Sequence, residues 1–438
     1  MHVPRIRDTS LAAEGGRKIE MAEALMPVLG MIRRRFAAEK PLKGITVAAC
    51  LHVTKETAVL VRTLREGGAE VVLTASNPLS TQDDVAAALA SEGVPVYAFR
   101  GMSNVEYYEA IGTALSYRPQ ITVDDGADLV TSLHKVALGR LDEAASTVAN
   151  VLGPGQAKNI IEEVWGGTEE TTTGVIRLRA LANEGLLAYP IIAVNDAKSK
   201  SLFDNPLGTG QSSIDGILRS TNILLAGKNI VVCGYGRVGA GIAERAKGMG
   251  GRVTVVDPDP FKALQAYMSG YNVTSMAKAA TYGDIFITAT GNIRVIRREH
   301  IERMKDGAIL ANAGHMDVEI DKTGLSEIAV AVERPRPGVD VYRLANGRRI
   351  ILLGEGRLVN LACAEGHPSE VMDLSFSIQA ESIRYIAENH ESMTGRVYDV
   401  PPAVDRNVAL LKLRSLGVEI EELTAEQEAY LKSWSYGT

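Results

Sequence analysis

The feature that most limits the possible folds of this chain is a repeated alternation of short apolar segments with helix-like segments. In the first half, strands are expected at 45–49, 69–74, 96–99 and 120–123, with helices between them. Apolar strands that alternate with amphipathic helices are typical of a parallel sheet covered on both faces. We therefore predict an α/β fold with a doubly wound parallel sheet.

A second alternation of the same kind begins near residue 210. Its expected strands are 229–233, 252–256, 284–289 and 308–312, and Asn346-Gly347 predicts a hairpin between 339–344 and 349–353. A single long helix, 369–390, follows and is too little for a third domain. We predict two Rossmann-like domains and a small C-terminal helical segment. The expected parts are a discontinuous first domain, 1–205 with a return segment 366–402, a second domain 206–365, and a C-terminal segment 403–438.

Three local expectations can be compared directly with the structure. Residues 1–40 are expected to be helical, and 140–168 are expected to be less regular. The run Ser80-Thr81-Gln82-Asp83 fits a capping box that opens a helix over 81–92. The tail is expected to pack on a neighbouring subunit or on the first domain, because it cannot bury a core alone.

Composition limits the class of protein. The chain has 438 residues, a net charge of −6 and three cysteines at separated positions. A mild charge without a dominant basic tract argues against nucleic acid as a partner, and Arg33-Arg34-Arg35 is interpreted as a solvated helix face. Separated cysteines suit reduced thiols, and no run approaches the roughly 18 apolar residues that a membrane span needs. We expect a cytoplasmic protein with no membrane partner.

A glycine-rich turn follows the expected strand 229–233 and opens the next helix. Its sequence is Gly234-Tyr235-Gly236-Arg237-Val238-Gly239, and Asp257 stands at the end of the following strand. This context matches the dinucleotide fingerprint, in which glycines let the backbone approach the pyrophosphate. An acidic residue at this place accepts hydrogen bonds from the ribose hydroxyls and repels a 2′-phosphate, which favours NAD over NADP. A purely structural turn is the alternative.

Several polar residues are candidates for catalysis, each beside a structural alternative. Lys200 and Asp204 stand four apart and would share one helix face, either as a surface ion pair or as a lysine-held carboxylate that activates a hydroxyl. The histidines follow apolar strands or lie near glycine, and for each a hydrogen-bonded structural role and a catalytic role are equally good interpretations: these residues are His52, His315 and His367. Two carboxylates, Asp125 and Glu170, stand at expected strand or helix ends, where a cap and a catalyst are equally good interpretations. No pair has metal-ligand spacing, so no metal site is predicted.

Six motifs in order give the chain a resemblance to the S-adenosylhomocysteine hydrolase family from about residue 6 to the C-terminus. The motifs are Leu51 to Ala58, Asp124 to Leu129, Glu169 to Gly174, Lys200 to Asn205, Asn312 to Asp317, and Gly366 to Ser369. The resemblance implies reversible hydrolysis of S-adenosylhomocysteine to adenosine and homocysteine with a tightly held NAD. In that chemistry C3′ of the ribose is oxidised, the ketone acidifies the C4′ proton, homocysteine leaves from C5′, water adds, and the ketone is reduced again.

The resemblance also implies roles for individual residues. Lys200 and Asp204 handle the 3′-hydroxyl, Glu170 binds the ribose hydroxyls, and His52, Asp125 and His315 serve the 5′ and homocysteine side. Thr54 and Glu56 match the adenine pocket, over which His367 closes. Cofactor contacts match Thr171, Thr172, Thr173, Asn205, Thr290, Ala313, Gly314, His315 and Asn360, besides Gly234, Gly236, Arg237, Val238, Gly239 and Asp257. The residue that removes the C4′ proton stays open, and the family suggests a homotetramer.

Three positions and the C-terminus depart from the family pattern. The family has an asparagine at Lys262, often a cysteine at Thr209, and an apolar residue at Glu365. The C-terminus, which ends Tyr436-Gly437-Thr438, lacks the lysine and tyrosine that reach a neighbouring subunit's NAD in longer members. The alternative substrate is S-inosylhomocysteine, against which Glu56 argues because a carboxylate would face the purine carbonyl. A non-catalytic NAD-binding homologue and a plain 2-hydroxyacid dehydrogenase are the remaining alternatives.

Overall fold

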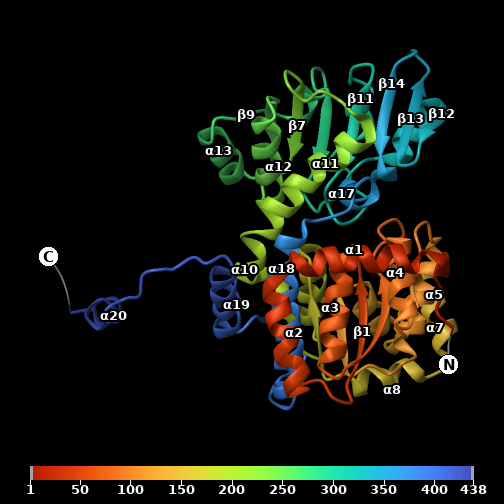
Figure 1. Cartoon of the computed structure of the whole chain (residues 1–438). Coiled ribbons are helices and arrows are strands. Elements are labelled where there is room, and N and C mark those ends of the chain that lie inside the picture. Colours follow the sequence, from red (N-terminus) through yellow and green to blue (C-terminus); the bar gives the residue numbers. More distant parts are fainter. Residues whose placement is uncertain (1–2, 436–438) are drawn as a thin grey trace.

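The computed structural model describes residues 3–435 and contains two sheets in two stacked lobes (Figure 1). The expectations that concern Tyr436, Gly437 and Thr438 lie outside the described residues. In Figure 1 the lower lobe holds the N-terminal segment together with the long helix α18, while the green and cyan segments form the upper lobe. The predicted α/β class with parallel, doubly wound sheets is confirmed.

The first sheet is parallel throughout and has the strand order β15-β6-β5-β4-β1-β2-β3. Its central strands are almost entirely buried, which is why they read as continuous apolar runs. The strands are β1 (Thr46–Leu51), β2 (Glu70–Ala75), β3 (Val96–Tyr97), β4 (Ile121–Asp124), β5 (Gly166–Glu169), β6 (Ile191–Ala193) and β15 (Val397–Asp399).

The second sheet has the order β12-β13-β14-β11-β10-β7-β8-β9 and is parallel from β14 to β9. The predicted hairpin is confirmed as β13 and β14, but a further antiparallel strand, β12, extends this edge. The strands are β7 (Asn229–Cys233), β8 (Arg252–Val256), β9 (Asn272–Val273), β10 (Ile285–Thr288), β11 (Ala308–Asn312), β12 (Ala329–Arg336), β13 (Val339–Leu344) and β14 (Arg349–Leu353).

Helices cover both sheets. Those of the first lobe are η1 (Thr9–Leu11), α1 (Ala12–Ala24), α2 (Pro27–Glu39), α3 (Lys55–Glu66), α4 (Asp83–Ser91), α5 (Asn104–Leu115), α6 (Asp128–Ala137), α7 (Glu143–Leu152), α8 (Gln156–Glu163), α9 (Thr172–Asn183), η2 (Val194–Asp196), α18 (Ser369–Asn389) and η5 (His390–Ser392). Those of the second lobe are α11 (Gly210–Thr221), α12 (Arg237–Gly248), α13 (Pro260–Met268), α14 (Met276–Ala279), α15 (Arg298–Ile301) and α16 (Lys322–Ile328).

Two chain crossings join the lobes. The outward crossing consists of α10 (Lys198–Ser201) and a single π-helical turn, η3 (Asp204–Thr209), which leads into α11. The return crossing runs through η4 (Gly354–Gly356) and α17 (Val359–Ala362) to α18. Although α18 lies in the core of the first lobe, it buries polar residues such as Ser375 and Gln379. Buried polar groups require partners, so this helix is a source of functional contacts.

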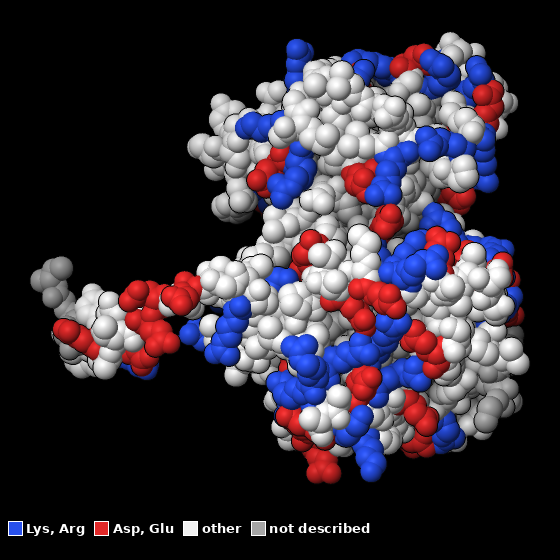
Figure 2. Space-filling view, in the orientation of Figure 1, with Lys and Arg blue, Asp and Glu red and all other residues white. Residues whose placement is uncertain are grey.

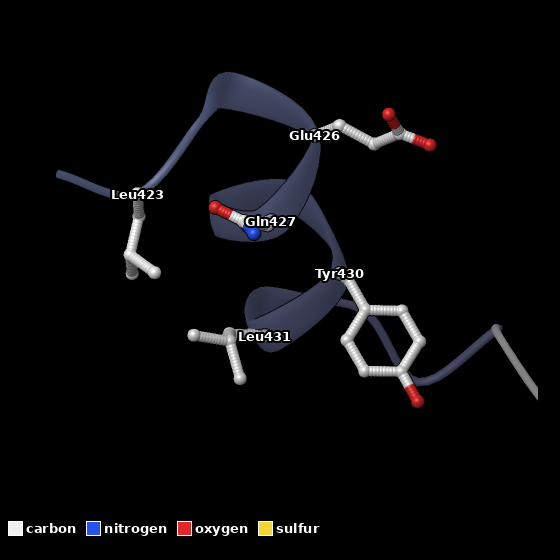
Figure 3. A pocket seen from close by; sticks show the side chains of 5 residues that line it. All are labelled: Leu423, Glu426, Gln427, Tyr430 and Leu431. Atoms are coloured by element: carbon white, nitrogen blue, oxygen red, sulfur yellow. The ribbon is translucent and has the colours of Figure 1, made fainter. Parts of the chain in front are cut away.

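The C-terminal tail extends away from both lobes (Figure 1). Its first helix, α19 (Pro402–Ser415), packs on the first lobe through the buried Val408. Its second helix, α20 (Ala425–Lys432), stands apart (Figure 1). Leu423, Tyr430 and Leu431, labelled in Figure 3, are among the residues that line a pocket on this segment. The apolar side chains of this segment are largely exposed, and that of Trp434 is 96% exposed.

Several predicted elements differ from the structure. The capping-box prediction at 80–83 is wrong, because α4 begins at Asp83 and the Ser80 hydroxyl bonds His52 and Asn77 instead. The segment 140–168 contains α7, α8 and β5 and is more regular than expected. The irregular part is the turn between α7 and α8, where Gly153 and Gly155 adopt positive φ. The N-terminal helix is divided at Met26, just before a proline at the first position of α2.

Charged side chains of both signs are interspersed over the face drawn in Figure 2. The basic run on α2 is neutralised in the same way, with Arg33 paired with Glu23 and Arg35 paired with Glu381. This pairing agrees with the interpretation of the run as a helix face. Among residues 3–435, none of the helices combines the length and the apolar character needed to cross a bilayer.

Candidate active site

One cavity of about 1000 Å³ lies between the two lobes, and residues of both sheets line it. The sequence-predicted residues that line this cavity are His52, Thr54, Glu56, Asp125, Glu170, Thr171, Thr172, Thr173, Lys200, Asp204, Asn205, Gly234, Gly236, Arg237, Val238, Asp257, Thr290, Ala313, Gly314, His315, Asn360 and His367. Gly239 is the one predicted site residue outside the lining. The fold therefore brings motifs that are up to about 300 residues apart in the sequence to a single place.

The cavity lies at the topological switch point of each sheet. In the first sheet, β1 has β4 on one side and β2 on the other, and His52 and Asp125 follow β1 and β4. In the second sheet, β7 has β10 and β8 beside it, and Gly234 and Thr290 follow β7 and β10. Ligands of open α/β sheets bind in the crevice at such points. Two ligand-binding edges thus face one common space.

Lys200 and Asp204 form a buried ion pair, not a surface pair. Lys200 Nζ lies 3.0 Å from Asp204 Oδ1, and the two side chains are only 5% and 4% exposed. Lys200 Nζ also donates to Asn205 Oδ1 at 2.9 Å and to Asn195 Oδ1 at 3.3 Å. Burial disfavours both charges, but mutual attraction outweighs it, so the pKa of Lys200 is raised and that of Asp204 is lowered. The pair therefore presents a fixed ammonium and a fixed carboxylate to the cavity.

Glu170 is the second acidic group beside this pair. Burial raises the pKa of Glu170 to about 8, although the Lys200 ammonium pulls it back in part. Gln379 Nε2 of α18 donates to Glu170 Oε2 at 2.6 Å, whereas Glu170 Oε1 has no hydrogen-bond partner within the described residues. At neutral pH this group carries a proton and can donate to a polar ligand in the cavity.

His52, Asp125 and His315 form a third cluster. His52 Nε2 lies 3.4 Å from Asp125 Oδ2, and His315 Nδ1 lies 3.7 Å from Asp125 Oδ1. His52 Nδ1 contacts the hydroxyls of Ser80 at 2.8 Å and Ser76 at 3.1 Å. Burial lowers the pKa of His52 to about 4, so its imidazole is neutral at physiological pH. One ligand atom from each of the three residues lies within 4.8 Å of the others, a juxtaposition that their spacing in the sequence does not predict.

Two further buried carboxyl groups hold the loop that carries Asp125. Asp124 accepts from the backbone N–H groups of Asp125 and Val130, and Glu169 Oε1 accepts from those of Gly126 and Thr171. Burial raises the pKa of Asp124 to about 7 and also raises that of Glu169 well above its usual value. Gly126 has φ +107°, and a side chain there would overlap the His315 ring. The glycine therefore permits the close approach of the two lobes at this cluster.

The glycine turn of the second lobe is shaped by backbone contacts. A Cβ on Gly239 would overlap the carbonyl oxygen of Gly234, whereas Gly236 faces open space. Gly239 thus acts from behind the cavity by letting α12 approach the turn. Asp257 Oδ2 accepts from the Tyr235 backbone N–H at 2.6 Å, and Oδ1 accepts from Asp259 at 2.9 Å. These bonds tie the carboxylate at the end of β8 to the turn.

The opposite end of the cavity is lined by Thr54, Glu56 and His367. Glu56 is 1% exposed and accepts a 2.6 Å hydrogen bond from Ser369 Oγ at the start of α18. His367 Nε2 lies 3.0 Å from Thr209 Oγ1, and its Nδ1 lies 3.4 Å from Asp204 Oδ2. His367 therefore connects the return crossing to both ends of η3.

Sequence reasoning missed the residues of α18 that support the site. Ser375 Oγ donates to Asp204 Oδ2 at 3.1 Å, and Gln379 holds Glu170, four residues further along the same helix. No local sequence signal pointed to them, because polar and apolar residues are interleaved through 369–390. Sequence reasoning also missed Glu319, which accepts hydrogen bonds from the backbone N–H groups of Thr290 and Gly291.

Comparison with known proteins gives a consistent result. A family model described as S-adenosyl-L-homocysteine hydrolase matches residues 4–437. A relative from Pyrobaculum aerophilum named adenosylhomocysteinase is 60% identical, and the match covers 99% of each chain. Relatives of the same name from Aquifex aeolicus and Pyrococcus abyssi are 57% and 55% identical over 99% of this chain, covering 99% and 98% of their own lengths.

Two solved structures among the matches resemble this chain less closely than these relatives do. A dipicolinate synthase chain from Bacillus halodurans is 13% identical, with a TM-score of 0.45, and the match covers 79% of this chain and 99% of that one. NAD+-bound 3-phosphoglycerate dehydrogenase of Entamoeba histolytica is 15% identical with a TM-score of 0.41, covering 79% of this chain and 96% of that one.

Proposed function

Because the chain belongs to the S-adenosyl-L-homocysteine hydrolase family, we propose that it reversibly hydrolyses S-adenosyl-L-homocysteine to adenosine and L-homocysteine. The observation that carries the proposal is the buried Lys200–Asp204 pair, which shares one cavity with a dinucleotide-type glycine turn. A hydrolase that only adds water has no need of such a turn, whereas an enzyme that first oxidises its substrate does.

The residues around the turn fit NAD. The glycine-only contact between Gly239 and Gly234 brings the helix N-terminus close to the cavity, where it favours a pyrophosphate. Asp257 offers a carboxylate that suits ribose hydroxyls and disfavours a 2′-phosphate. The group would be held by Thr171, Thr172, Thr173, Asn205, Gly234, Gly236, Arg237, Val238, Asp257, Thr290, Ala313, Gly314, His315 and Asn360. When bound, NAD supplies a hydride acceptor that is regenerated within the turnover.

The proton chemistry at the sugar is assigned to the first lobe. The Lys200–Asp204 pair takes and returns the proton of the 3′-hydroxyl, since its ammonium and carboxylate are fixed at 3.0 Å. Glu170 donates to the ribose hydroxyls, because its pKa of about 8 leaves it protonated at neutral pH. Oxidation at C3′ makes the C4′ proton acidic, and the residue that removes this proton stays open.

The 5′ side is assigned to His52, Asp125 and His315. A neutral His52 beside Asp125 can accept a proton from the water that adds at C5′ after the thiol has left. His315 comes from the second lobe and lies 3.7 Å from the same carboxylate, so it places the homocysteine portion only when the lobes are together. Thr54, Glu56 and His367 are assigned to the purine.

We further propose that the two crossings near 200 and 360 form a hinge whose closure excludes water from the ketone. The predicted division into 1–205 with 366–402, 206–365 and 403–438 follows these crossings. We also propose that the protein is cytoplasmic and acts in the methyl cycle. We propose that it forms a homotetramer, and the exposed apolar residues of the tail, including Leu431 and Trp434, support such an assembly.

Thiol release from S-adenosyl- and S-inosylhomocysteine, assayed separately, tests the proposed activity. The proposal expects release from the adenosyl compound to be faster. S-inosylhomocysteine hydrolysis by the same mechanism is the second candidate, and faster release from the inosyl compound would establish it instead. Stoichiometric accumulation of reduced cofactor without thiol would indicate a simple dehydrogenase.

A further inference from the structure

Lys55 is a buried cation immediately behind the purine end of the cavity. It is the first residue of α3, and its Nζ lies 3.3 Å from Glu56 Oε1 and 3.0 Å from Glu365 Oε2. Its side chain is only 13% exposed, yet it does not line the cavity. Lys55 therefore acts on a ligand only through its neighbour Glu56.

Contacts from both lobes fix the position of this ammonium. Arg219 Nη1 on α11 of the second lobe lies 3.2 Å from Glu365 Oε1. Gln82 accepts from the Lys55 backbone N–H at 3.2 Å and donates to the Glu365 carbonyl oxygen at 3.3 Å. The chain Glu56–Lys55–Glu365–Arg219 thus connects the purine pocket to the second lobe.

The ammonium controls the charge of Glu56. A carboxylate that is 1% exposed needs an opposite charge to stay ionised, because burial otherwise favours the protonated form. The Ser369 hydroxyl at 2.6 Å can bond either form and does not decide between them. Burial would lower the pKa of Lys55, but attraction to Glu56 and Glu365 outweighs burial and raises it. Lys55 is consequently charged at neutral pH.

The other charged groups near Glu56 are committed elsewhere. His367 of the return crossing bonds Thr209 and faces Asp204. Within the described part of the chain, Arg219 is paired with Glu365 and Asp215. The carboxylate of Glu365 contacts the same Lys55 ammonium as Glu56 does. Among the described residues, Lys55 is the cation in direct contact with Glu56.

The charge of Glu56 matters for the identity of the purine. An ionised carboxylate only accepts hydrogen bonds, so it suits an exocyclic amino group and opposes a carbonyl oxygen at the same position. A protonated carboxyl can donate to that carbonyl. Resting on the proposed hydrolase function, we propose that Lys55 is a positioning residue that sets the preference for a 6-amino over a 6-oxo purine by keeping Glu56 ionised.

The test compares Lys55→Met with the wild type on S-adenosyl- and S-inosylhomocysteine. We expect the ratio of the two kcat/KM values to fall by about tenfold near neutral pH, because a buried polar mismatch carries an effect of this size. Lys55→Arg should retain the wild-type ratio. Arg65→Met, at the exposed far end of α3, is the matched control for loss of a positive charge.

Equal losses on both substrates, or a ratio that Lys55→Arg does not retain, would overturn the proposal in favour of a structural role. In a Glu56→Gln background, adding Lys55→Met should leave the ratio unchanged, and a further fall would also contradict it. If Lys55→Met does not fold, Lys55→Gln replaces it. If the wild type cleaves neither compound, the hydrolase proposal fails separately, and calorimetric affinities for adenosine and inosine in the same variants decide the role of Lys55.

Discussion

The two walls of the cavity use different physical means. The wall from the first lobe carries buried ionisable groups with shifted pKa values, among them Lys200, Glu170 and His52. The wall from the second lobe relies on backbone shape, with Gly234 and Gly239 in contact and Asp257 held by N–H groups. Ionisable groups suit proton transfer, while exposed backbone suits recognition of a large ligand. The comparison teaches that reaction and cofactor retention should be separable by mutation.

The largest expected effect is that of Lys200→Met. Loss of the ammonium should reduce turnover by about 10³-fold or more, because it removes the group that fixes Asp204 at the 3′-hydroxyl. The variant should also unfold at a lower temperature, since Asp204 is left buried without its partner. The matched control is Lys198→Met, an exposed lysine of the same helix α10. Near-normal turnover with unchanged bound NAD would remove Lys200 from the reaction.

The corresponding change on the other wall is Gly239→Ala. The added Cβ would overlap the Gly234 carbonyl oxygen, so α12 must move away from the turn. We expect NAD affinity to fall by about 100-fold, while the first lobe keeps its structure. Gly248→Ala on the same helix, where an added Cβ meets nothing within 4 Å, is the control. Equal affinities, measured by calorimetry on the stripped protein, would refute the role given to the turn.

The variant Glu170→Gln tests whether a buried carboxyl group of the first-lobe wall makes the stability of the protein depend on pH. The folded-state pKa of Glu170 is raised from 4.5 to about 8, so the unfolded chain loses its proton first and wild-type stability falls as pH rises through this window. Near pH 8 the neutral variant should therefore be the more stable protein, by at most about 5 kcal/mol, and the advantage should vanish near pH 4.5. Thermal unfolding across this range measures it, and a pH-independent difference would contradict the assignment.

The smallest effect is expected for Asp257→Asn. This change keeps the shape of the side chain but removes its charge. We therefore expect NAD to bind about tenfold more weakly, whereas the affinity for NADP should fall less or rise. The nearby Lys262 also lines the cavity and should favour a 2′-phosphate once the carboxylate is neutral. Parallel titrations with both dinucleotides give the result, and an unchanged ratio of affinities would undo the assignment of Asp257.

Prediction from sequence succeeded where local patterns decide structure. The strands 229–233, 252–256, 308–312 and the hairpin were placed to the residue, because apolar runs and an Asn-Gly turn are local signals. The strand β12 was missed because seven of its eight residues are exposed and Pro335 lies within it. An edge strand of this kind is specified by its pairing with β13 and not by its own sequence.

The site was predictable in its residues but less so in its support. Motifs named about half of the residues that line the cavity. The spacing of Lys200 and Asp204 also fitted a surface pair until burial distinguished the two. The roles of Ser375 and Gln379 depend on α18 entering the core of the first lobe. No local pattern states that a polar helix face is buried, since such faces ordinarily point to solvent.

The most direct test of the separation between the two walls is thiol release by protein stripped of its dinucleotide. The account predicts that stripped protein releases no homocysteine from S-adenosylhomocysteine, and that adding NAD restores release to the untreated rate. Circular dichroism before and after stripping confirms that the fold is retained. Undiminished release from the stripped protein would contradict the claim that the substrate must be oxidised at C3′ before its thioether bond can break.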